Sequence, residues 1–165
     1  MPLTPTQKET ARLIMRRYLE RAEESRPKIH YSQSRPMTHL GKSPSVEWTA
    51  DCSGLVTGAF YWTDQHAQFK LKDPNGLNYN GYGFTGTLLS HNRSGRVPFD
   101  RRFFVGDMVL YGPSLFDTRH VAICRKDGLA DSALWTSHGS ESGPVPVLMH
   151  YRKDALVVVR AEDLR

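Results

Sequence analysis

The sequence predicts an α+β domain in which two helices pack on an antiparallel β-sheet, and three observations lead to this prediction. Apolar residues recur at helical spacing in two stretches of the N-terminal half, residues 5–24 and the stretch that begins at Cys52. Short apolar runs bounded by turn residues occupy the C-terminal half. The 165 residues suit one domain spanning 1–165, and a sheet of about five to six strands is expected.

The first helix is expected to begin after Thr4 and to run to about Glu24. The run Thr4-Pro5-Thr6-Gln7 provides an N-cap threonine, a proline at the first helical position and a glutamine that completes a capping box. Pro27 ends the helix. One face is apolar and carries Ala11, Ile14, Met15, Tyr18, Leu19 and Ala22.

The second helix is expected to begin within a residue or two of Cys52. Apolar residues follow at i+3, i+4, i+7 and i+8, and both Thr49 and Asp51 are good N-cap types. A thiol in the first turn of a helix experiences the positive end of the helix dipole and unpaired N–H groups, which favour the nucleophilic thiolate. The same N–H groups are donors for a developing oxyanion. A buried Cys that serves as a small apolar residue fits this local sequence equally well.

The sheet is expected from the C-terminal half of the chain. Five segments have strand character, at residues 105–111, 120–124, 133–136, 145–150 and 156–160. Lys126-Asp127-Gly128 suits a tight hairpin turn between the second and third of them. Residues 63–102 are loop-rich and are interpreted as one wall of a groove, with a short helical turn near residues 87–89.

Three reactive side chains follow one another in an informative order. Cys52 lies on a helix, His120 opens a strand, and His138 ends the next strand. A side chain at the start of a strand can project past the sheet edge toward a helix N-terminus. The order supplies a nucleophile, a base and a group that orients the base. Glu141 is the nearest alternative to His138 in sequence.

Several motifs carry a resemblance to a known family. Asp51-Cys52-Ser53-Gly54, then Gly106-Asp107 leading a strand, then His120-Val121-Ala122-Ile123 before a glycine turn, resemble the NlpC-type papain-like cysteine peptidases. These are cell-wall endopeptidases and amidases with a papain-like α+β core. The likeness covers about residues 28–144, and the run 137–141 resembles forms carried by bacteriophage lysins.

The resemblance implies a role for each reactive residue. Cys52 would attack an amide of the wall stem peptide and form a thioester, His120 would act as base and then as acid, and His138 would orient His120. The family also has an upstream tyrosine whose hydroxyl assists at the oxyanion site, and Tyr31 is the match. Ser32-Gln33-Ser34-Arg35-Pro36 stands where the family often has glycines.

Four further residues are assigned to the substrate groove. Asp51 and Ser53 fit two interpretations equally, as helix caps and, by the resemblance, as the lining of the subsite for the stem-peptide end. Arg119 stands where the family commonly has a small residue and is expected at the same subsite. Trp48 is assigned to packing and, as a close neighbour of Cys52, to the rim of the groove.

Composition sets the expectations about partners and cofactors. The formal net charge of +5 suits an anionic polymer. Charge alone does not choose among teichoic acids, lipid headgroups and nucleic acid; the resemblance favours the peptidoglycan stem peptide, so no nucleic-acid partner is expected. Both cysteines are expected to be free thiols. Neither Cys-x-x-Cys nor His-Glu-x-x-His occurs, so no metal and no organic cofactor is expected.

The place of action follows from the same resemblance. No apolar run approaches the roughly 18 residues of a membrane span, and no signal peptide is visible at the N-terminus. We expect a monomer made in the cytoplasm that reaches the cell wall by a phage or lysis route. Two other functions remain open: a Cys-His amidase or deamidase acting on protein, and a catalytically silent wall-binding or virion structural module.

Overall fold

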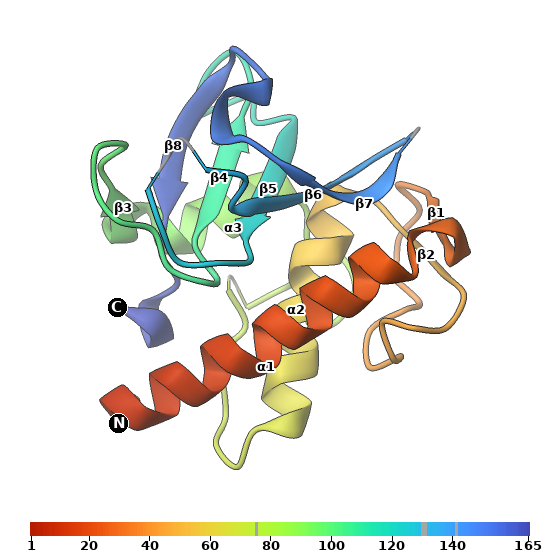
Figure 1. The fold of residues 1–165 in the computed structure, drawn as a ribbon, viewed down its shortest axis with the longest axis horizontal. Helices are drawn as coiled ribbons and strands as arrows, with labels where there is room; N and C mark the ends of the chain where they lie inside the picture. The colour runs from red at the N-terminus through yellow and green to blue at the C-terminus, as the bar shows by residue number, and fades with distance from the viewer. Residues whose placement is uncertain (75, 130–131, 141) are drawn as a thin grey trace.

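A six-stranded antiparallel sheet forms one layer of the protein, and two helices cover one of its faces (Figure 1). The computed structural model describes residues 1–74, 76–129, 132–140 and 142–165. The strands of this sheet are β3 (Arg96–Val97), β4 (Met108–Tyr111), β5 (His120–Cys124), β6 (Trp135–Gly139), β7 (Gly143–Val147) and β8 (Ala155–Val159). Their order is β3-β8-β4-β5-β6-β7, with every neighbouring pair antiparallel. The predicted α+β class is confirmed.

Helix α1 (Pro5–Glu24) has the predicted bounds because its cap is local. The Thr4 hydroxyl accepts the Gln7 N–H at 3.2 Å, and the Gln7 side chain accepts the Thr4 N–H at 2.9 Å, which completes the capping box. Pro27 lies in the short 3-10 helix η1 (Arg26–Lys28) that follows. The buried face consists of Ala11, Met15, Tyr18, Leu19 and Ala22.

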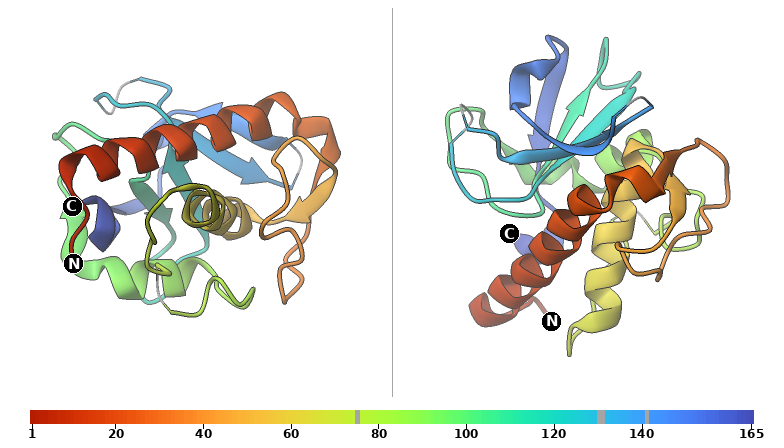
Figure 2. Two further views of the ribbon diagram at one scale, coloured as in Figure 1. Left: turned by 90° about the horizontal axis from the view of Figure 1, so that it is seen from below. Right: turned by 45° about the vertical axis from the view of Figure 1, so that its right-hand side comes forward.

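Helix α2 (Cys52–His66) also begins where the sequence predicts. Asp51 is its N-cap, and the carboxylate accepts the Gly54 N–H at 2.7 Å. Helices α1 and α2 pack against each other on the same side of the sheet, where α2 contacts β5 and β6 and α1 contacts β7 (Figure 2). A Cβ at Gly58 would lie 2.5 Å from the Tyr18 hydroxyl, so the missing side chain permits the close approach of α1 and α2.

A second, two-stranded sheet leads directly into α2. Strand β1 (Ile29–Tyr31) pairs in parallel with β2 (Trp48–Ala50), and Tyr31 lies opposite Ala50. Sequence reasoning did not find this pair, because three-residue strands are too short to show a period. The pairing fixes the backbone immediately before Asp51 and brings Tyr31 to the N-terminal end of α2.

The sheet is buried on both faces, so its central strands are continuous apolar runs. The helix-facing core contains Met108, Leu110, Val121 and Ile123 among others. The opposite core contains Val109, Tyr111, Ala122, Cys124 and Trp135 among others. Cys124 is fully buried there, in keeping with its expected packing role.

Three predicted details of the sheet are wrong. The strand expected near 145–150 is β7, which begins at Gly143 and ends at Val147, and the 3-10 helix η3 follows it. Lys126-Asp127-Gly128 does not form a tight hairpin: Asp127 accepts the Val105 N–H at 2.9 Å, and Gly128 bridges to Phe103. These contacts join the turn to the segment before β4 and leave a longer connection from β5 to β6. Strand β6 therefore begins at Trp135, two residues later than predicted.

The remaining helices are short. Helix α3 (Thr85–Asn92) is longer than the turn expected there, and η2 (Arg93–Gly95) follows it. The 3-10 helix η3 (Met149–Tyr151) lies between β7 and β8, and η4 (Glu162–Leu164) closes the chain. Among the helices that the structure describes, none is both long enough and apolar enough to cross a bilayer.

Candidate active site

Cys52 is the first residue of α2 and is only 5% exposed. Burial and the neighbouring Asp51 carboxylate raise the pKa of the thiol to about 11, although the backbone N–H groups of Val121, Ser53 and Cys52 itself lower it. The prediction of a thiolate at this helix end is therefore wrong, because desolvation outweighs the helix N-terminus. At neutral pH Cys52 is a thiol, and a base has to remove its proton before it can attack.

His120 is the first residue of β5, next to the point where this strand meets Cys52. The N–H of Val121, the next residue, lies close enough to the Cys52 sulfur to affect its pKa, so helix α2 and strand β5 meet at this point. Burial and then the Arg152 guanidinium lower the pKa of His120 to about 4, against the opposing influence of nearby carboxylates. The imidazole is thus neutral at pH 7 and has a lone pair for a proton.

Two hydroxyl groups hold one nitrogen of the His120 ring. His120 Nε2 lies 2.7 Å from Ser137 Oγ and 2.6 Å from Tyr151 Oη, and the two oxygens are 3.1 Å apart. In the described ranges, Nδ1 has no hydrogen-bond partner, and no hydrogen bond joins the ring to the Cys52 sulfur. Catalytic hydrogen bonds often form only when substrate binds, so proton transfer between the two groups would require this bond to form in the substrate complex.

His138 does not have the orienting position that the sequence predicts. Ser137 and His138 are neighbours on β6, so their side chains point to opposite faces of the sheet. Ser137 contacts His120, whereas His138 Nε2 lies 3.2 Å from the His30 carbonyl oxygen. The alternative residue, Glu141, lies outside the described residues.

Tyr31 is held near the start of α2 by its neighbours. Its ring makes an edge contact with the His138 ring, at 5.5 Å between centroids. Its hydroxyl accepts a hydrogen bond from Gln33 Nε2 at 3.1 Å. The structure therefore brings Tyr31 to the Cys52 end of α2, with its hydroxyl on Gln33.

An open pocket of about 360 Å³ lies beside Cys52. The residues that line it are Gln33, Arg35, Asp51, Cys52, Ser53, Tyr82, Phe84, Thr85 and Arg119. Three of the predicted substrate residues, Asp51, Ser53 and Arg119, thus share one pocket with Cys52. The long segment 63–102 contributes Tyr82 and Phe84, which are 59% and 54% exposed and so present their rings to a ligand.

Trp48 lies away from this surface. It is 4% exposed, and its ring stacks on His39 with 4.7 Å between centroids. His39 in turn contacts the Gly54 carbonyl through Nε2 at 2.8 Å, which supports the first turn of α2. The assignment of Trp48 to packing is confirmed, and its burial contradicts the assignment to the groove rim.

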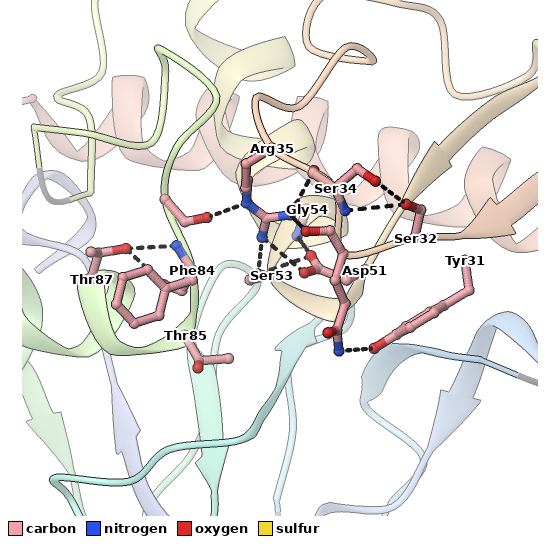
Figure 3. Close-up of polar contacts among 12 residues, drawn as sticks. Tyr31, Ser32, Ser34, Arg35, Asp51, Ser53, Gly54, Phe84, Thr85 and Thr87 are labelled. Carbon is pink, nitrogen blue, oxygen red and sulfur yellow. Dashed lines mark hydrogen bonds and ion pairs between the residues drawn. The ribbon is translucent and has the colours of Figure 1, made fainter.

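Arg35 is a pocket residue that sequence reasoning did not assign to the site. One terminal nitrogen donates to Asp51 Oδ2 at 2.8 Å and to Ser53 Oγ at 3.1 Å (Figure 3). The other guanidinium nitrogens donate to carbonyl oxygens of Gln33, Ser34 and Gly83. All five N–H donors of the guanidinium therefore have an acceptor. Arg35 lies in the run Ser32–Pro36, which stands where the peptidase family often has glycines, and this departure could have pointed to Arg35 as a site residue.

The same network saturates Asp51. Its Oδ1 accepts the Gly54 N–H at 2.7 Å and the Ser53 hydroxyl at 2.9 Å, and its Oδ2 accepts from Arg35. Of the two interpretations of Asp51 and Ser53, the capping role is the one with visible hydrogen bonds. Arg35 already supplies the positive partner that a charged substrate group would otherwise provide.

Fold and site together define the class of this protein: an α+β protein in which a buried Cys on a helix N-terminus faces a strand opened by a neutral His. No three or more His, Cys, Asp or Glu side chains within the described ranges are grouped so that they could hold a metal ion. No model of a known protein family matches the chain. A search of curated proteins gives no match either.

Proposed function

We propose that this protein is a cysteine peptidase that hydrolyses an amide bond in the stem peptide of bacterial peptidoglycan. One observation carries the proposal: the Cys52 thiol, at the N-terminus of α2, lies against the backbone of β5 beside His120, at a pocket open to solvent. This is the arrangement expected of the NlpC-type papain-like peptidases that the sequence motifs resemble. Nucleophile and base on separate rigid elements suit covalent catalysis.

The proposed reaction begins with two neutral groups. His120 Nδ1 accepts the Cys52 proton as the sulfur attacks the amide carbon, and N–H groups of the first turn of α2 donate to the oxyanion. The carbon–nitrogen bond then breaks, the proton passes from His120 to the leaving amine, and a thioester remains. Water attacks the thioester and gives one proton to His120. The acid product leaves when the thioester bond breaks and Cys52 recovers that proton.

The surroundings of Cys52 support an extended anionic substrate. The pocket is open, and its exposed rings, Tyr82 and Phe84, offer flat surfaces to a peptide chain. Arg119 at its edge is 64% exposed in its side chain, and the chain as a whole carries a net charge of +5. Such a charge favours the encounter with an anionic wall polymer.

Digestion of purified sacculi tests the proposal. We expect the wild-type protein to release fragments with new free amino groups and no new reducing sugar ends, because a thiolate attacks amides and not glycosides. Mass analysis of the fragments identifies the bond, and Cys52→Ala is the control that should release nothing. New reducing ends, or full activity of Cys52→Ala, would refute the proposal.

Two other results point to the alternative functions. Unchanged sacculi that nevertheless pellet the protein tightly indicate a silent wall-binding module. Release of ammonia from soluble proteins, without any change in sacculi, indicates a protein deamidase.

A further inference from the structure

The hydroxyl pair on His120 comes from two elements that are distant in sequence. Ser137 lies on β6, and Tyr151 is the last residue of η3. Each oxygen is within 2.7 Å of His120 Nε2, and the two oxygens are 3.1 Å apart, so the three atoms form a closed triangle. Sequence reasoning found neither residue.

Packing holds Tyr151 in this position. The Tyr111 ring lies 5.6 Å from the His120 ring and 5.7 Å from the Tyr151 ring, between centroids. The Tyr111 hydroxyl donates to the Met149 carbonyl at 2.7 Å, which ties η3 to β4. On the other side, the Arg152 guanidinium lies over the Tyr111 ring at 5.6 Å. Tyr151 is therefore fixed by its neighbours on both sides along the chain.

We propose that Ser137 and Tyr151 are the positioning residues of the Cys52–His120 pair: their oxygens accept the Nε2 hydrogen and so keep Nδ1 unprotonated and available to the thiol. The inference rests on the proposed function, since it assigns a task within the same reaction. In this arrangement the two oxygens share the single Nε2 hydrogen, one hydroxyl donates its own hydrogen to the other oxygen, and the remaining hydroxyl hydrogen points out of the triangle. The ring nitrogen left over, Nδ1, is then the one that would take the Cys52 proton.

The use of hydroxyl groups in place of a carboxylate has a chemical consequence. A carboxylate hydrogen-bonded to His120 would stabilise the protonated ring, whereas a neutral hydroxyl fixes the tautomer with less effect on charge. Arg152, Asp154, Asp51 and His138 act on His120 through their charge, and none of these four is hydrogen-bonded to the ring. Tyr151, which is hydrogen-bonded to it, stays neutral because burial raises its pKa. The base is thereby oriented and also kept neutral.

Four variants and one control test the inference. Tyr151→Phe and Ser137→Ala should each lower kcat on sacculi about tenfold with little change in KM, as expected for one lost hydrogen bond that orients a base. The double variant should lose more than either single variant, and Ser137→Thr, which retains a hydroxyl, should recover most of the activity. Tyr79→Phe is the matched control, because it also removes one tyrosine hydroxyl, whose oxygen lies 3.4 Å from the Lys72 carbonyl.

The tautomer of His120 is a readout that does not depend on the substrate. Nitrogen NMR of the wild-type protein at pH 7 should show the hydrogen on Nε2, and the double variant should show a mixture of tautomers. A hydrogen on Nδ1 in the wild type, or wild-type turnover and tautomer in the double variant, would overturn the inference. If no Cys52-dependent activity on sacculi is found, the proposed function fails, and the tautomer measurement alone then decides whether the hydroxyl pair sets the protonation of His120.

Discussion

Removal of the Arg35 guanidinium should strongly destabilise the protein. Arg35→Met keeps much of the side-chain stem but leaves Asp51, whose side chain is only 9% exposed, without its charged partner. Loss of one member of a buried ion pair costs about 3–5 kcal/mol. Asp51 retains its bonds to Gly54 and Ser53, so the low end of that range, about 3 kcal/mol, is expected. For a domain of this length that corresponds to a fall in Tm of about 6–12 °C.

Thermal unfolding followed by circular dichroism measures this loss, and Arg119 provides a matched control. Arg119 also lines the pocket and also pairs with an aspartate, Asp117, but both side chains are at least half exposed. Arg119→Met should therefore change stability by about 0–1 kcal/mol. The double variant Arg35→Met/Asp51→Asn should lose less stability than the sum of the two single variants, because no buried charge remains and Asn still caps α2. A Tm for Arg35→Met no lower than that of Arg119→Met would refute the reasoning.

Three further predictions follow. Limiting iodoacetamide should label Cys52 before Cys124. The rate of labelling should rise throughout pH 7–9, because burial raises the pKa of Cys52 to about 11. Peptide mapping checks this, and preferential labelling of Cys124 contradicts it. Burial lowers the pKa of both His39 and His120 to about 4. Between pH 6.5 and pH 4 the unfolded chain binds protons that the folded protein does not, so acid should lower the free energy of unfolding by up to about 3 kcal/mol for each His. Urea unfolding of His39→Phe should show a free energy of unfolding that depends less on pH than that of the wild type. An equal pH dependence would contradict the lowered pKa of His39. Activity on intact sacculi should fall as salt rises, while activity on a small neutral stem peptide should not, because salt screens only the encounter with the polymer.

The sequence by itself determined the features that depend on neighbouring residues. The first residues of α1 and α2 follow from Thr4 and Asp51, since a cap hydrogen bond spans only three residues. Strand β5 was predicted residue for residue because its apolar run is bounded at both ends. The same local patterns selected Cys52 and His120, the two residues that the fold brings to one junction.

Only the tertiary structure decided which groups surround these two residues. Strand β6 begins two residues later than predicted, and the side chains of Ser137 and His138 point to opposite faces of the sheet. Which of the two side chains meets His120 therefore depends on the register of β6 against its neighbours, and contacts elsewhere in the chain impose that register. Arg35 and Tyr151 reach the site through loops whose path has no periodic pattern. The protonation of Cys52 was predicted with the wrong sign, because the helix N-terminus is a local feature of the sequence, whereas the burial that outweighs it comes from the packing of the whole chain.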